Sequence, residues 1–227
     1  FNTNISSSTS SAWNAMSSLL SVDSSTWGSS FTITDGSGTD TIDLSGYSSN
    51  QSLNLQAAAK TDTTLIASTV GDYSFNKQNL FIAPGTVIEN ASGGSGDDEI
   101  TGNAADNSIK GNAGNDTLSG STGSDTLEGG SGNDLINGGL LGTDIAVFSG
   151  VLSDYSFTGS SRIGRYTAVD LRSGSTDGTD TLVDIERVRF AGSGEEVLIS
   201  QLINPYSTIH TAGSVAFQKS SGSGLYA

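Results

Sequence analysis

A nine-residue repeat constrains the fold of this chain more than any other feature, and it runs from residue 93 to residue 144. Its units read GGSGDDEIT, GNAADNSIK, GNAGNDTLS, GSTGSDTLE and GGSGNDLIN, followed by GGLLGTDIA, which carries one extra residue. Positions six and eight of the regular units hold, respectively, Asp98, Asn107, Asp116, Asp125 and Asp134, and Ile100, Ile109, Leu118, Leu127 and Ile136. A period held without a slip indicates a solenoid of stacked units.

The residue types at each position predict the shape of one unit. Glycine at positions one, two and four allows backbone conformations with φ > 0, which residues with a Cβ rarely adopt. The three residues after position six form a short strand whose aliphatic member points inward. Two units then make one turn of loop, strand, loop and strand, and successive turns stack about 4.8 Å apart. We therefore expect an all-β fold, a right-handed parallel β-roll flanked by antiparallel strands.

The charge of the chain indicates what stabilises such a roll. Twenty-four acidic residues face nine basic ones, for a net charge of −15, and residues 93–144 hold nine acids and a single lysine, Lys110. Stacked carboxylates repel one another unless a cation lies between them. Ca²⁺ takes 6–8 oxygen ligands, which two Asp side chains and several backbone carbonyls can supply. We therefore predict calcium ions between stacked loops, four or more in the whole chain.

Loops two units apart lie on the same edge of the roll, which fixes the expected pairs. They are Asp98 with Asp116, Asp116 with Asp134, and Asp125 with Asp144. The pair Asn107 with Asp125 has one carboxylate only, so a site there would be weaker or empty. The alternative is that each Asp only caps its own turn. That alternative does not explain five units in phase.

Composition excludes several other classes of protein. An acidic chain with a pI near 4.1 lacks the clustered Lys and Arg that phosphate contacts need, so we expect no nucleic-acid partner. No apolar run approaches the ~20 residues of a membrane-spanning helix. Without Cys there are no disulfides or thiolate metal sites. A low apolar content with a high net charge is also typical of disordered chains. The regular repeat favours instead a folded chain whose acidic residues bind cations.

The flanking segments suggest four regions. We expect a Ser-rich N-terminal segment at 1–30 that links to an upstream domain, the roll with its N-terminal cap at 31–144, a C-terminal β module at 145–204, and a polar tail at 205–227. Residues 31–47 look like a degenerate calcium loop, and residues 51–90 like capping strands. Strands are also expected at 144–148, 155–157, 166–171 and 182–190. The stretch DGTDTLVD, residues 177–184, is interpreted as a turn before a strand rather than as a metal site.

No catalytic constellation is visible in the sequence. His210 is the only histidine, so an H-E-x-x-H zinc motif is impossible within this chain. We expect the chain not to be a catalyst by itself, which makes a stand-alone hydrolase or lyase the weakest hypothesis. A surface- or polysaccharide-binding module is the stronger alternative, because Tyr155 and Tyr166 could stack on sugars. Their alternating placement favours strand packing instead.

Residues 31–140 resemble the C-terminal domain of serralysin-type secreted bacterial metalloproteases. The matching stretches are FTITDGSGTDTIDLSGYS, NLFIAPGTVIENASGGSGDDEITGNAADN and the nonapeptides that follow. The start, Phe1-Asn-Thr-Asn, resembles the segment where the catalytic domain of that family ends. The stretch from Thr143 to Phe190 looks instead like a β module that follows the repeats in other large calcium-repeat (RTX) proteins.

The resemblance implies particular calcium ligands. For the non-repeat site they are Asp35, Ser37, Gly38, Asp40, the Val87 carbonyl and Glu89. The first two roll sites would use Gly94, Gly96, Asp98, Gly111, Ala113 and Asp116, and then Asn112, Gly114, Asp116, Gly129, Ser131 and Asp134. The site on the opposite edge would use Ser121, Gly123, Asp125, Gly138, Leu140 and Asp144.

The resemblance also implies a function. Such a module leaves the cell through a type I secretion apparatus and folds when it meets extracellular calcium. It then acts as an intramolecular chaperone and stabilising domain for an attached enzyme, here a serralysin-like zinc metalloprotease. The expected location is extracellular.

Overall fold

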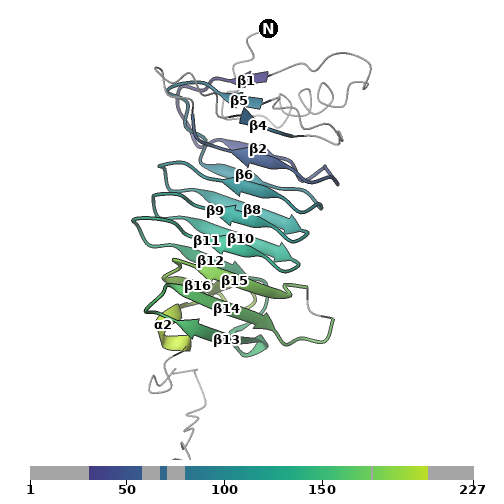
Figure 1. The fold of residues 1–227 in the computed structure, drawn as a ribbon, viewed down its shortest axis with the longest axis vertical. Coiled ribbons are helices and arrows are strands. Elements are labelled where there is room, and N and C mark those ends of the chain that lie inside the picture. Colours follow the sequence, from purple (N-terminus) through teal and green to yellow (C-terminus); the bar gives the residue numbers. More distant parts are fainter. Residues whose placement is uncertain (1–30, 58–66, 71–79, 175, 204–227) are drawn as a thin grey trace, which may run out of the picture.

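The computed structural model describes residues 31–57, 67–70, 80–174 and 176–203. They form two seven-stranded sheets, whose strands follow one another along the long axis of the molecule, and one three-stranded sheet (Figure 1). The predictions made for residues 1–30 and for the tail with His210 lie outside the described residues.

The chain alternates between the two large sheets as it advances along the long axis from the N-terminal end. In spatial order, the first sheet contains β2 (Thr41–Asp43), β6 (Asn90–Ser92), β8 (Ser108–Ala113), β10 (Thr126–Ser131), β12 (Ile145–Phe148), β16 (Arg187–Phe190) and β17 (Glu195–Leu198). The second contains β3 (Ser52–Asn54), β7 (Glu99–Thr101), β9 (Thr117–Ser119), β11 (Leu135–Asn137), β15 (Thr179–Val183), β14 (Arg165–Asp170) and β13 (Tyr155–Ser160). This arrangement confirms the all-β parallel roll.

Strand register follows the 18-residue turn that the repeat predicts. Leu127 pairs with Ile109, and Ile136 pairs with Leu118, each 18 residues apart in parallel strands. The position-eight side chains are at most 1% exposed, so they form a continuous column between the sheets. Fully burying each Leu or Ile contributes about 1.5–3 kcal/mol. Each repeat strand therefore contributes a single aliphatic side chain to the core of the roll.

A small sheet caps the N-terminal end. It consists of β1 (Phe31–Ile33), β5 (Leu80–Ile82) and β4 (Ala67–Ser68), with β1 and β5 parallel (Figure 1). Ile33, Leu80 and Ile82 are buried under it. Of the strands expected in residues 51–90, β3 belongs to the roll itself, because it pairs in parallel with β7.

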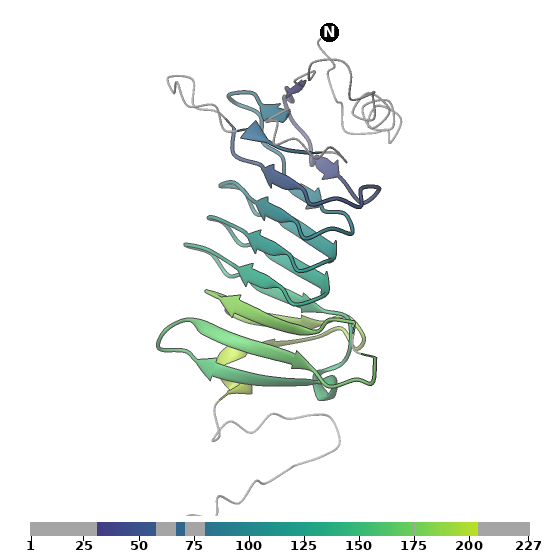
Figure 2. The same cartoon turned by 45° about the vertical axis from the view of Figure 1, so that its right-hand side comes forward.

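The C-terminal part continues the roll instead of forming a separate sheet. Strand β12 pairs in parallel with β10, β15 with β11, and β16 with β12. The boundary predicted at residue 144 thus falls inside both sheets. An antiparallel hairpin, β13–β14, is inserted between β12 and β15 and pairs with β15 (Figure 2). Strand β17, antiparallel to β16, and the short helix α2 (Ile199–Leu202) complete this end.

One predicted strand is wrong. Residues 182–190 form two strands, since β15 ends at Val183 in one large sheet and β16 begins at Arg187 in the other. Asp184 lies between them with φ +48°, in the left-handed region, which breaks the extended chain and turns it into the opposite sheet.

Aromatic residues of the C-terminal part pack together in the interior. The rings of Phe148, Tyr155, Phe157 and Phe190 lie with centroids 5.0–6.4 Å apart. Tyr155 and Tyr166 are both buried, which confirms strand packing and argues against exposed rings that stack on a sugar. Within the described part of the chain, no helix has the length and apolar character needed to cross a membrane.

Candidate metal sites

Polar side chains stack in two columns, one along each edge of the roll. The first column contains Gln51, Asp98, Asp116, Asp134 and Asp180. The second contains Asp40, Glu89, Asn107, Asp125, Asp144 and Glu186. Nearly all of these side chains are buried, although they lie at the corners where the chain passes between the sheets.

Hydrogen bonds connect neighbouring members of each column. The backbone N–H of Asp98 donates to Asp116 Oδ1 at 2.7 Å, and that of Asp116 donates to Asp134 Oδ1 at 2.8 Å. In the second column the N–H of Asp125 donates to Asp144 Oδ1 at 2.8 Å. The structure therefore brings together all three of the predicted carboxylate pairs.

The extra residue of the sixth unit does not disturb its column. It is accommodated in an outward bulge, where Leu141 has φ +69° and is 81% exposed. Gly142 and Asp144 then resume the register of the loop below. Leu140, a predicted carbonyl ligand, lies in this bulge and donates its own N–H to the Ser121 carbonyl.

The second oxygen of several column carboxylates has no protein partner. Among the described residues, the Oδ2 atoms of Asp40, Asp116, Asp125 and Asp134 are buried and make no hydrogen bond. An unpaired buried charge is costly in a protein interior. These oxygens therefore mark places where a cation would compensate the charge.

Carbonyl oxygens converge on the same places. A Cβ built on Gly111 would clash with both Asp116 Oδ2 and the Gly129 carbonyl, and one on Gly120 would clash with Asp125 Oδ2 and the Gly138 carbonyl. Each carboxylate thus faces the position-one carbonyl of the loop above it, as the implied ligand sets require. The position-one glycines do not have positive φ, so the expectation that they supply it is wrong. Glycine is needed there because carboxylate and carbonyl oxygens occupy the place that a Cβ would take.

The donor set fits calcium better than zinc. No three carboxylate or imidazole side chains form a metal cluster in the described residues, and each predicted roll site combines two carboxylates with backbone carbonyls. Three predicted carbonyl ligands, those of Gly94, Ser121 and Ser131, also accept backbone hydrogen bonds from neighbouring loops. A carbonyl has two lone pairs and can accept such a bond and still face a cation. Ca²⁺ tolerates this irregular, oxygen-only surrounding.

Asn107 differs from the other members of its column. Its side-chain NH₂ donates to the carbonyls of Ile88 and Glu89, at 3.2 and 3.1 Å. Its amide oxygen lies where Asp116 and Asp125 have their unpaired Oδ2, next to the position-one glycine, but this oxygen carries no charge and already accepts the Asn103 N–H at 2.8 Å. This arrangement favours the expectation that the Asn107 level binds an ion weakly or not at all.

The predicted non-repeat site is brought together at the N-terminal end of the second column. The Asp40 N–H donates to Glu89 Oε2 at 2.8 Å, and the Ser37 N–H donates to Asp35 Oδ2 at 2.9 Å. Burial raises the pKa of Asp40 to about 6, helped by a hydrogen bond to Asp35 and by repulsion from Asp35 and Glu89. Val87, whose carbonyl is the remaining predicted ligand from this stretch, is half-exposed.

Burial, reinforced by neighbouring carboxylates, raises the pKa of the column acids. The pKa of Asp116 is raised to about 7, and those of Asp134 and Asp144 to about 6. Burial also raises the pKa of Asp98 and Asp125. In the folded, metal-free chain these groups bind protons more tightly than in the unfolded chain. Protons and calcium would therefore compete for the same oxygens.

These shifts predict that acid promotes order in the metal-free chain. Because the folded-state pKa values lie above the unfolded value of 3.8, the stability they contribute is complete below that value and is lost as the pH rises through 6 to 7. We expect more β-structure by circular dichroism at pH 5 than at pH 8 after calcium has been stripped over a chelating resin. Loss of β-structure on acidification would contradict this prediction.

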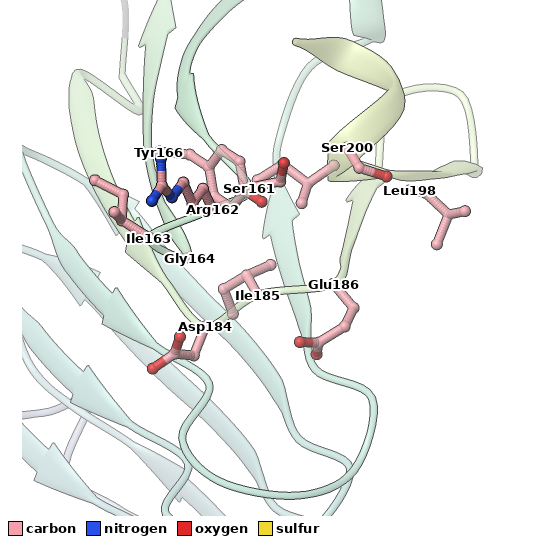
Figure 3. A pocket seen from close by; sticks show the side chains of 11 residues that line it. Ser161, Arg162, Ile163, Gly164, Tyr166, Asp184, Ile185, Glu186, Leu198 and Ser200 are labelled. Carbon is pink, nitrogen blue, oxygen red and sulfur yellow. The ribbon is translucent and has the colours of Figure 1, made fainter. Parts of the chain in front are cut away.

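A pocket of about 550 Å³ lies at the C-terminal end, and none of the predicted ligands lines it (Figure 3). It is bounded by the tip of the β13–β14 hairpin (161–164), the corner 184–186 and the start of α2. Glu186, which Figure 3 shows beside Ile185, accepts the backbone N–H of Asp144 at 2.8 Å and so also belongs to the second column. None of the ion pairs among the described residues involves Arg162 of this pocket.

Sequence reasoning did not place the last member of either column: it interpreted the stretch with Asp180 as a turn before a strand, and it did not consider Glu186. A signal for Asp180 was present, because Gly-Thr-Asp occurs at 38–40, at 142–144 and again at 178–180. In all three cases the residue two positions past the Asp is a buried strand residue: Ile42, Ala146 and Leu182. For Glu186 the sequence offers no comparable signal.

These features define a class of protein: a capped parallel β-roll whose nonapeptide loops stack acidic side chains in two columns. The family described as peptidase M10 serralysin C terminal matches residues 10–220. The chain belongs to this family and is a serralysin-related C-terminal domain.

Similar proteins match a shorter stretch. Serralysin C from Dickeya chrysanthemi is 47% identical over 68 residues, which are 30% of this chain and 12% of that protein. Metallopeptidase AprA from Pseudomonas marginalis is 45% identical over 70 residues, 31% of this chain and 13% of that protein. Serralysin from Photorhabdus sp. (strain Az29) is 44% identical over 68 residues, 30% of this chain and 12% of that protein. The matched stretch thus spans about an eighth of each of these curated relatives.

Proposed function

We propose that this chain is a calcium-binding module that folds on export into a calcium-rich medium. The observation that carries the proposal is the pair of columns with buried, unpartnered carboxylate oxygens at Asp40, Asp116, Asp125 and Asp134. Without a cation, a chain of charge −15 with a narrow core would gain little by folding. Ions bound only to the native state stabilise it by mass action.

The magnitude is sufficient to reverse the sign of folding. At a free calcium concentration 100 times the Kd, each independent site adds about 2.7 kcal/mol. Four sites would add roughly 11 kcal/mol, comparable with the about 5–15 kcal/mol total stability of an ordinary domain. The chain would stay unfolded where calcium is scarce, as inside a cell, and fold outside.

The attached partner that we propose is a serralysin-like zinc metalloprotease. The family membership and the names of the relatives, serralysin and metallopeptidase, support this part of the proposal. The module would leave the cell by type I secretion together with the enzyme, and would then act as its intramolecular chaperone and stabiliser. An H-E-x-x-H helix encoded upstream of Phe1 would support this partner, and an unrelated upstream domain would contradict it.

A calcium titration followed by far-UV circular dichroism tests the proposed function. We expect little β-structure in chelator and a cooperative gain as calcium rises to millimolar concentrations. Magnesium is the matched control, because it demands near-octahedral geometry and gives up its water reluctantly, so it should not induce the fold. A chain that is equally structured in chelator and in calcium would overturn the proposal.

A further inference from the structure

The first column extends one level beyond the nonapeptides. Strand β15 lies in register above β11, with Thr181 opposite Leu135 and Leu182 opposite Ile136. The Asp134 N–H donates to Asp180 Oδ1 at 2.8 Å, as the Asp116 N–H does to Asp134 Oδ1. Asp180 therefore occupies the place that a position-six Asp of another repeat would take.

The two residues before Asp180 also match a repeat loop. The Thr179 N–H donates to Asn133 Oδ1 at 2.8 Å, just as the Asn133 N–H donates to Asn115 Oδ1 at 2.9 Å. A Cβ on Gly178 would clash with the Gly132 carbonyl, as one on Gly132 would clash with the Gly114 carbonyl. Gly178, Thr179 and Asp180 are thus structural positions four, five and six of one more loop.

This loop is hard to recognise in the sequence because it is interrupted. Asp180 follows Asp134 by 46 residues instead of 18, and the hairpin β13–β14 fills the difference. Asp177 closes the base of the insertion, since it accepts hydrogen bonds from the N–H and hydroxyl of Ser149, at 2.8 and 2.6 Å, and from the Tyr155 hydroxyl, at 2.6 Å. The hairpin is therefore an insertion into a loop of the roll.

The space between these two levels contains an uncompensated acid. Asp134 is 3% exposed and its Oδ2 has no partner among the described residues, while Asp180 is 2% exposed. Asp134 Oδ2 is aimed at Gly129 in the same way that Asp116 Oδ2 is aimed at Gly111. The nearby Arg172 pairs with Asp170 and Asp177, and no ion pair of the described residues reaches Asp134 or Asp180.

We infer that Asp134 and Asp180 hold a further calcium ion, one level beyond the last regular repeat. This ion would fasten the turn that carries the β13–β14 hairpin to the repeats beneath it. The inference rests on the proposed function, because it assumes that the repeat columns bind calcium. It adds that the C-terminal part shares in that binding, although it lacks the nonapeptide sequence.

Calcium stoichiometry tests the inference. Asp180→Asn keeps the oxygen that accepts the Asp134 N–H but removes the charge. We expect equilibrium dialysis at saturating calcium to find one bound ion fewer in Asp180→Asn than in the unchanged chain. Glu195→Gln is the matched control, since it removes one charge from the same end of the molecule outside the columns and should leave the stoichiometry unchanged.

The outcomes separate this inference from the proposed function. If the unchanged chain binds several ions and Asp180→Asn binds as many, the inference is overturned and the proposed function stands. If the unchanged chain binds none, the proposed function fails. Should Asp180→Asn fail to fold in calcium, crystals of the unchanged chain grown with Tb³⁺ decide the matter. An anomalous peak between Asp134 and Asp180 would support the inference, and peaks at the repeat levels alone would overturn it.

Discussion

Asp116→Asn is expected to abolish calcium-induced folding at calcium concentrations where the unchanged chain folds completely. Asp116 lies between Asp98 and Asp134 in the first column and is a predicted ligand of two ions at once. Asn retains the oxygen that accepts the Asp98 N–H, so the backbone arrangement can persist while the charge is lost. Losing two sites would cost about 5 kcal/mol at a calcium concentration 100 times the Kd, close to the whole stability of a marginal domain.

The measurement is the midpoint of the calcium titration, followed by circular dichroism. We expect the midpoint of Asp116→Asn to shift upward at least tenfold, or the transition to disappear. Glu99→Gln is the control, because Glu99 is exposed on β7 and its loss should move the midpoint little. Equal midpoints for Asp116→Asn and Glu99→Gln would show that the column does not bind the ions that drive folding.

The second large effect is expected from Gly132→Ala, which tests the close stacking of the loops. Gly132 has φ +134°, and a Cβ there would clash with the Gly114 carbonyl of the loop below. The clash cannot be relieved by a rotamer change, because the obstacle is backbone. We expect a loss of about 4 kcal/mol or more, since strain and overpacking act together.

Substitutions at two other glycines separate backbone strain from the steric clash. Gly174 has φ +74° but open space around its Cβ position, so Gly174→Ala should show only the backbone strain of about 1–2 kcal/mol. Gly46 has neither constraint, and Gly46→Ala should be within about 0.5 kcal/mol of the unchanged chain. Urea unfolding in saturating calcium measures all three. If Gly132→Ala were no worse than Gly174→Ala, the loops would not stack as closely as described.

The repeat made the central part of this fold predictable because its period is also its structural step. Advancing 18 residues moves the chain up one level, so Asp98, Asp116 and Asp134 had to lie one above another. The sixth unit remained predictable despite its extra residue, since an outward bulge at Leu141 costs no core contact. The role of the position-one glycines was harder to foresee, because it depends on atoms of the next loop.

Prediction became weaker where insertions separate neighbouring levels. The hairpin between β12 and β15 hides the relation of Asp180 to Asp134. The corner 184–186 is much shorter than a nonapeptide loop, yet it still places Glu186 beside Asp144. Local propensity identified most strands of this region, but it could not assign them to sheets, because the assignment depends on contacts between residues far apart in the chain.

The strands at the two ends of the roll affect how two such molecules could associate. A parallel sheet that ended on a bare strand would present a row of unpaired N–H and C=O groups, ready to add a strand from a second molecule. Here the stack of parallel levels is terminated by the small β1–β5–β4 sheet at one end and by the antiparallel strands β13 and β17 at the other. Each level contacts only its neighbours, so a further pair of nonapeptides would lengthen the molecule by about 4.8 Å and leave both terminations unchanged. The number of levels can thus change while the edge strands of the two large sheets, β2, β3, β13 and β17, stay the same.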